Sequence, residues 1–230
     1  MKTAKRFYKQ VTTSPVDNGF AVLLDGRQLK TPGKLPLIAP SAHAAALVAA
    51  EWDAQKDTIQ PGTMPVTRLV NVAIELTPSN RDQLAEEARR YGGTDLLCYR
   101  AAEPLELAEH QAEQWDPVLK WAALKGFSLK TTQTVKAIDQ DPQSLENIAA
   151  YAAKQDDLHL TLLTHLTAVY GSAVLAIAVM ERNISGPKAF NLSRLDNLYQ
   201  IRQWGEDQEA AEIAANLEAE TVALCQLLEA

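Results

Sequence analysis

The side chains best suited to chemistry are scattered along this 230-residue chain and form no familiar catalytic or metal-binding motif. The four histidines are His43, His110, His159 and His165. His159 and His165, the two that lie closest in sequence, are six residues apart, so on one helix they point in different directions. We therefore expect packed or surface histidines and no metal centre.

The cysteines and paired carboxylates give no catalytic pattern either. Cys98 and Cys225 lie far apart without a C-x-x-C spacing, which favours a reducing compartment, although a disulfide between them stays open. Glu86 and Glu87 are adjacent, so on a helix they face apart and indicate a solvated surface. The sequence contains no phosphate-binding glycine loop and no G-x-S-x-G frame. We predict no enzyme, no metal and no cofactor, while a site assembled from scattered residues stays open.

Composition narrows the class of protein further. Lys and Arg total 22 against 29 Asp and Glu, and a formal charge of -7 argues against a broad basic face for nucleic acid. Hydrophobic residues make up 47% of the chain, which is typical of a folded core. Residues 159–180 carry no charged side chain and are long enough to cross a bilayer. Gly171 and Ser172 interrupt this stretch, so we expect two buried helices and no stable membrane insertion.

The N-terminal part is predicted to be β-rich. Residues 7–12, 19–24 and 27–31 are expected to form strands. Asp25 and Gly26 separate the second and third strands, and this pair predicts a type I′ hairpin turn because both central positions need positive φ. We therefore assign Asp25 and Gly26 structural roles.

A helix is expected to follow from Ser41, whose side chain can cap it, to about residue 55. Ala44, Val48 and Trp52 share one face of that helix, which predicts a structural, core-packing role for Trp52. A binding hot spot at Trp52 is the second alternative.

The rest of the chain is predicted to be mostly helical. The fold class is α+β, with a β-rich N-terminal domain of one or two helices at residues 1–95 and an all-α helical bundle at residues 96–230. A hinge near Gly92 and Gly93 stays open. The expected helices cover residues 80–93, two stretches opened by Pro104 and Pro117, and residues 142–154, 157–169, 172–181, 187–204 and 206–230.

Seven stretches in register along nearly the whole chain resemble one protein family. The family comprises the ATP synthase assembly chaperones that bind the alpha subunit of the soluble catalytic sector, often called the ATP-twelve family. No single stretch would be specific, but seven in family order are. The stretches are residues 7–9, 24–32, 51–55, 64–69, 94–100, 115–117, and 192–196 running on to 199–200 and 204–205.

The resemblance implies a non-enzymatic chaperone that binds the ATP synthase alpha subunit and shields it until it joins beta, without ATP hydrolysis. Family members occur in mitochondria and in related bacteria. This chain shows no leader pattern at its basic N-terminus, so we expect a bacterial, cytoplasmic member.

The resemblance also implies candidate partner-binding residues. They are Asp196, Arg194, Tyr199, Gln200 and Trp204. At position 196 the family pattern has Glu, so the contact there is altered by one methylene. Asp196 has two interpretations: an internal partner for an arginine or a helix end, or a polar anchor for a client surface.

Two other functions stay open from the sequence. One is a hydrolase-like enzyme with a site between the two domains. The other is an adaptor for a different protein.

Overall fold

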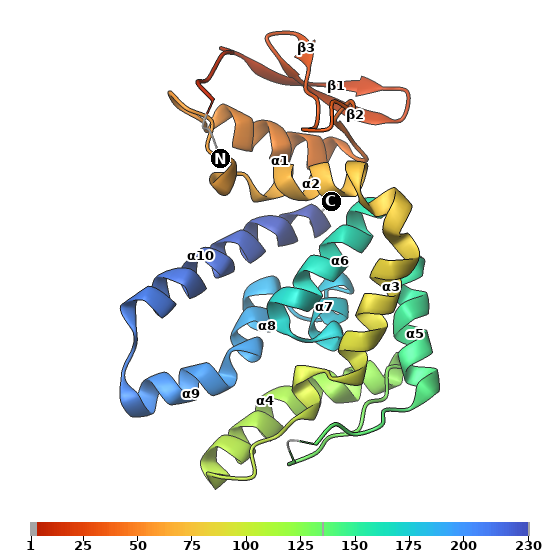
Figure 1. The fold of residues 1–230 in the computed structure, drawn as a ribbon, viewed down its shortest axis with the longest axis vertical. Helices are drawn as coiled ribbons and strands as arrows, with labels where there is room; N and C mark the ends of the chain where they lie inside the picture. Colours follow the sequence, from red (N-terminus) through yellow and green to blue (C-terminus); the bar gives the residue numbers. More distant parts are fainter. Residues whose placement is uncertain (1–3, 135, 230) are drawn as a thin grey trace. The chain divides into compact units, whose positions relative to one another are not determined.

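The chain divides by its internal contacts into two compact units, residues 1–80 with 223–230, and residues 81–222. The structure, a computed structural model, describes residues 4–134 and 136–229. A small antiparallel sheet near the N-terminus is followed by ten α-helices among the described residues, which confirms the predicted α+β class (Figure 1). The predicted division into residues 1–95 and 96–230 stays a prediction about domains. Residues 1–3, where the leader was judged absent, lie outside the described residues.

The sheet of the first unit is built around its second strand. β2 (Gly19–Leu24) pairs antiparallel with β1 (Val11–Val16) on one edge and with β3 (Arg27–Gln28) and β4 (Ile38–Ala39) on the other. Because β2 is central, its side chains are the most buried of the sheet. They pack against the first helix. The buried core there comprises Ala21, Val22, Leu24, Leu37, Ala44, Ala45 and Val48.

The turn between β2 and β3 confirms the predicted hairpin. Asp25 and Gly26 have φ angles of 49° and 77°, as a type I′ turn requires. The Asp25 carboxylate also accepts hydrogen bonds from the backbone N–H groups of Gln10 (2.8 Å) and Lys9 (3.0 Å), which lower its pKa. The strand predicted over residues 7–12 begins too early, because the N–H groups of Lys9 and Gln10 bond a side chain and β1 starts only at Val11.

The helices of the first unit are capped by side chains. Ser41 accepts a hydrogen bond from the Ala44 N–H at 3.1 Å, which confirms the predicted start of α1 (Ala42–Asp53). Glu51 on α1 accepts from the N–H groups of Val66 and Thr67, each at 2.7 Å, at the start of α2 (Pro65–Glu75). Two short 3-10 turns complete the unit, η1 (Pro61–Thr63) and η3 (Gln226–Leu228).

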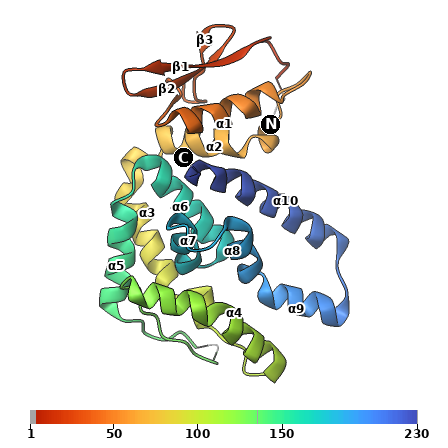
Figure 2. The same cartoon turned by 180° about the vertical axis from the view of Figure 1, so that it is seen from behind.

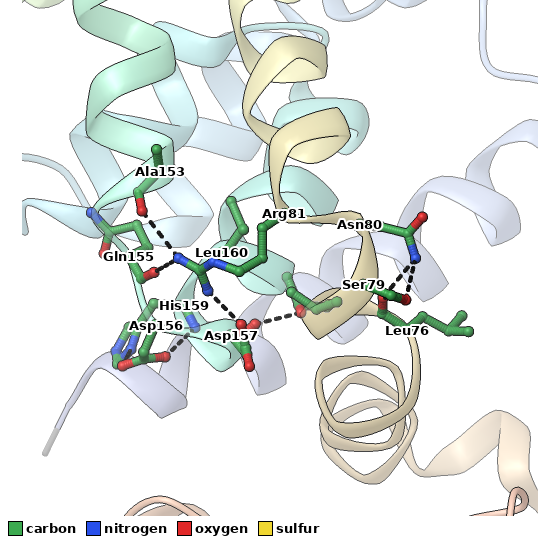
Figure 3. Close-up of polar contacts among 12 residues, drawn as sticks. Leu76, Ser79, Asn80, Arg81, Ala153, Gln155, Asp156, Asp157, His159 and Leu160 are labelled. Atoms are coloured by element: carbon green, nitrogen blue, oxygen red, sulfur yellow. Dashed lines mark hydrogen bonds and ion pairs between the residues drawn. The ribbon is translucent and has the colours of Figure 1, made fainter.

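The third helix begins earlier than the sequence predicts. α3 (Thr77–Gly93) carries Pro78 in its first turn, where a missing N–H costs little. The predicted start at residue 80 is wrong, because Asn80 lies inside the helix and its side-chain amide donates to the Leu76 carbonyl at 2.6 Å (Figure 3).

Arg81, one residue further along α3, ties the second unit together. Its guanidinium pairs with Asp157 and donates to the carbonyls of Ala153 and Gln155, all at the junction of α5 (Pro142–Ala153) and α6 (Asp157–Tyr170) (Figure 3). One side chain of α3 thus contacts both the end of α5 and the start of α6.

The second unit is a helical bundle around α7 (Ala173–Met180), whose residues from Ala173 to Val179 are all buried. α7 packs against α6, α4 (Leu105–Leu124) and α8 (Gly186–Ser193) (Figures 1 and 2). Gly171, at φ 63°, separates α6 from α7, which confirms the two predicted buried helices. Within residues 4–134 and 136–229, no helix combines the length and apolar content that a bilayer crossing requires.

Candidate functional site

After α8 the helical path is interrupted twice, at Arg194 and at Gly205, and two further helices follow. α9 (Leu195–Trp204) follows α8 after Arg194, and α10 (Gln208–Cys225) follows Gly205, which has φ 90°. The single helix predicted over residues 187–204 is therefore wrong.

A contact from another helix accompanies the break at Arg194. The indole N–H of the buried Trp115 on α4 donates to the Leu192 carbonyl at 3.0 Å, an acceptor that a continuous helix would use for the Asp196 N–H. The Arg194 N–H bonds to the Asn191 carbonyl, three residues back, at 3.2 Å. Leu192 and Leu195 are buried on either side of the break, whereas Leu198, one turn further along, is exposed.

A groove of about 700 Å³ lies between α8, α9 and α10. Its walls are mostly apolar, and several of the lining side chains face solvent: Trp204 is 79% exposed and Ile213 61%. Exposed apolar side chains gathered in one place mark a surface for interaction more often than a packing defect. The apolar lining comprises Phe190, Leu198, Ile201, Trp204, Ile213 and Leu217.

The groove has acidic side chains in the loop after α9 and on α10. Glu206, Asp207 and Glu218 belong to the lining, and residues 206–220 contain six acidic residues and no Lys or Arg. Arg194, just before α9, places its guanidinium over the Phe190 ring, 5.4 Å from its centroid. The groove therefore presents an apolar surface beside negatively charged side chains.

Three of the five predicted partner-binding residues come together in this groove. Arg194, Gln200 and Trp204 line it, whereas Asp196 and Tyr199 do not. Sequence reasoning missed the second wall. Ile213 and Leu217, four residues apart in the helix predicted over residues 206–230, carry the signal of an apolar face.

Asp196 instead contacts α4. Its carboxylate accepts a hydrogen bond from the Gln111 amide at 2.6 Å, and the carbonyl oxygen of that amide accepts from the Ala101 N–H at 2.7 Å. Of the two interpretations, the structure contains the internal contact, with Gln111 as the partner. Client contact at Asp196 stays a prediction.

Arg100 holds the neighbouring part of α4. Its guanidinium pairs with Asp116 at 2.9 Å, donates to the Leu97 carbonyl at 2.9 Å and lies over the Trp115 ring at 5.1 Å. Arg100, Trp115 and Leu192 belong to three of the stretches used for the family resemblance. These three stretches are therefore in contact with one another at the end of α8.

The other charged group buried in the second unit also serves the fold. Asp95 in the loop before η2 (Leu96–Cys98) accepts from the Ser172 hydroxyl at 2.7 Å and from the N–H groups of Val174 and Leu97. Burial raises its pKa to about 6. These contacts cap η2 and α7, and nothing in them points to a reacting group.

Trp52 belongs to the first unit and does not line the groove. Ala44 and Val48 of the predicted stripe are buried, whereas Trp52 is only half-buried. Its ring lies 5.6 Å from that of Tyr8, whose hydroxyl donates to the Trp52 carbonyl at 2.6 Å. Within the described part of the chain, its indole N–H is buried without a hydrogen-bond partner.

The groove has the character of a protein-binding surface: apolar, open and bordered by charge. In residues 4–134 and 136–229, no three His, Cys, Asp or Glu side chains gather as metal ligands would. The site thus defines a class of protein that binds a partner surface.

Comparison with known proteins gives the family. The family described as ATP12 chaperone protein matches residues 5–123, more than half of the chain. The crystal structure of Atp12 from Paracoccus denitrificans superposes with a TM-score of 0.92 at 40% identity, covering 98% of this chain and 97% of that one, and a mutant of that protein matches equally. The mitochondrial protein atp12 of Schizosaccharomyces pombe is 26% identical over 91% of this chain and 76% of its own. The chain belongs to the ATP12 family of ATP synthase assembly chaperones.

Proposed function

We propose that this chaperone binds the alpha subunit of ATP synthase in the bacterial cytoplasm and shields the surface that later meets beta. Apolar contact supplies the affinity, and the beta subunit displaces the chaperone during assembly. ATP hydrolysis by the chaperone has no part in this cycle.

The observation that carries the proposal is the groove between α8, α9 and α10. Solvent-exposed apolar side chains from two helices line it, Trp204 above all. Arg194 and Gln200, also implied by the family resemblance, lie in the same lining. An assembly chaperone needs such a surface because it must hold an apolar client face and then release it.

The experiment uses purified alpha subunit diluted from denaturant, with and without this protein. We expect alpha to stay in the supernatant only when the chaperone is present, and no phosphate to be released from ATP by the chaperone alone. If alpha precipitates equally in both samples, the proposed function is wrong.

A further inference from the structure

The structure allows a more specific statement about what occupies the groove. We propose that the groove between α8, α9 and α10 receives an amphipathic α-helical segment of the client with an apolar face flanked by Lys or Arg. This inference rests on the proposed function, because the segment is taken to belong to the client.

The helical form of the occupant follows from the walls. Both long walls are helices, α9 and α10, whose backbone N–H and C=O groups are bonded along their own axes. They offer no open sheet edge with which an extended peptide could pair. A segment entering the groove must satisfy its own backbone, and a helix does so while presenting an apolar face.

The apolar face of the occupant follows from the exposed side chains. Trp204 and Leu198 project from α9, and Ile213 from α10, so contact is available from both walls. Burying these side chains against a complementary helix face removes their apolar surface from water. The groove volume of about 700 Å³ accommodates a few large side chains from one helix face.

The basic flanks of the occupant follow from charge complementarity. Glu206 and Asp207, in the loop after α9, and Glu218 on α10 line the groove. Arg194 is the one cation among the described lining residues. Lys or Arg beside the apolar face would therefore be attracted by these three carboxylates, and acidic flanks would be repelled.

The same charges argue against a second copy of this chain as the occupant. Its formal charge is -7, and its α9–α10 segment carries the six acidic residues of positions 206–220. Two such segments brought together would place like charges against each other.

The test uses three synthetic peptides and the full chain. The first is a helix-forming peptide of Leu, Ala and Lys with Leu along one face. The second has Glu in place of every Lys, and the third keeps the Lys content but scatters the Leu positions. Binding is measured by the fluorescence anisotropy of a labelled peptide. The emission of Trp204 is obtained by subtracting the spectrum of Trp204→Phe from that of the wild type.

We expect the Lys peptide to bind with a blue shift of Trp204 emission, and the Glu and scattered peptides to bind ~10-fold more weakly or worse at low salt. Glu206→Lys combined with Glu218→Lys should remove most of the preference for Lys over Glu. Glu109→Lys, at an exposed position on α4 outside the groove, should preserve it.

Three results would overturn the inference: equal binding of the Lys and Glu peptides, unchanged binding of the Lys peptide by Trp204→Ala, or a dimer in sedimentation that buries Trp204. If the peptides fail while the chain still keeps alpha soluble, the proposed function stands and this inference falls. If the peptides behave as expected but alpha precipitates, the groove chemistry stands and the client is another protein.

Discussion

Gln111 bridges the loop before α4 to the first turn of α9 through both ends of its amide. It is fully buried, accepts from the Ala101 N–H at 2.7 Å and donates to Asp196 at 2.6 Å. A carboxylate in the first turn of α9 is also favoured by the helix dipole. Asp196 therefore helps to hold the helix that forms one wall of the groove.

Removing either partner of this contact should destabilise the second unit. Gln111→Ala removes the hydrogen-bond partner of both the Ala101 N–H and the Asp196 carboxylate. We expect it to lower the free energy of unfolding by about 1–3 kcal/mol. Asp196→Ala should cost less, because Asp196 is partly exposed. Denaturant midpoints of both single variants and the double variant give the coupling energy. A coupling energy of zero would mean that the two residues act independently.

Arg100 is expected to matter more for stability than any exposed arginine. Its side chain is 9% exposed and makes an ion pair, a carbonyl contact and a ring contact, so Arg100→Ala should cost about 3 kcal/mol. Arg202→Ala, at an exposed position on α9, is the matched control and should change stability by less than ~0.5 kcal/mol. Equal thermal midpoints for the two variants would contradict the role assigned to Arg100.

Asp95 should make stability depend on pH. Burial raises its pKa from 3.8 to about 6 in the folded protein, so the fold binds this proton more tightly than the unfolded chain does. Its contribution is fully present below pH 3.8 and is lost as pH rises through about 6. We expect the wild type to lose stability relative to Asp95→Asn between about pH 4 and about pH 7. Chemical denaturation of both proteins across that range measures the difference, and a difference that is constant or of opposite sign would refute the prediction.

The hairpin turn gives a prediction for the first unit. Gly26 has φ 77°, and no atom lies within 4 Å of the position of an added Cβ, so only backbone strain opposes substitution. Gly26→Val should cost roughly 1–2 kcal/mol, and Gly26→Asn less, because Asn tolerates positive φ better. Thermal melting that ranks Val as the milder change would be inconsistent with the type I′ turn.

Local patterns predicted the parts of the fold that depend on neighbouring residues. Asp25 with Gly26 predicted the hairpin, Ser41 predicted the start of α1, and Gly171 predicted the junction of two buried helices. Each is decided within a few residues by φ or by a side-chain cap.

Long-range contacts decided the parts that the sequence did not predict. The contact that accompanies the break at Arg194 comes from Trp115, 77 residues before its acceptor at Leu192. The second wall of the groove forms because α10 follows α9 after the turn at Gly205. The sequence therefore predicted the candidate residues around Trp204 but not Ile213, which lines the same groove. Such pairings have no local signature.

If the groove binds the client, the solubility of isolated alpha subunit must depend on the side chains that line it. Wild type and Leu124→Ala, which removes an apolar side chain 89% exposed on α4 outside the groove, are both expected to keep alpha in the supernatant. Trp204→Ala, with an unchanged circular dichroism spectrum and melting midpoint, is expected to bind alpha ~30-fold more weakly and to let it precipitate. Full protection of alpha by Trp204→Ala would contradict the account.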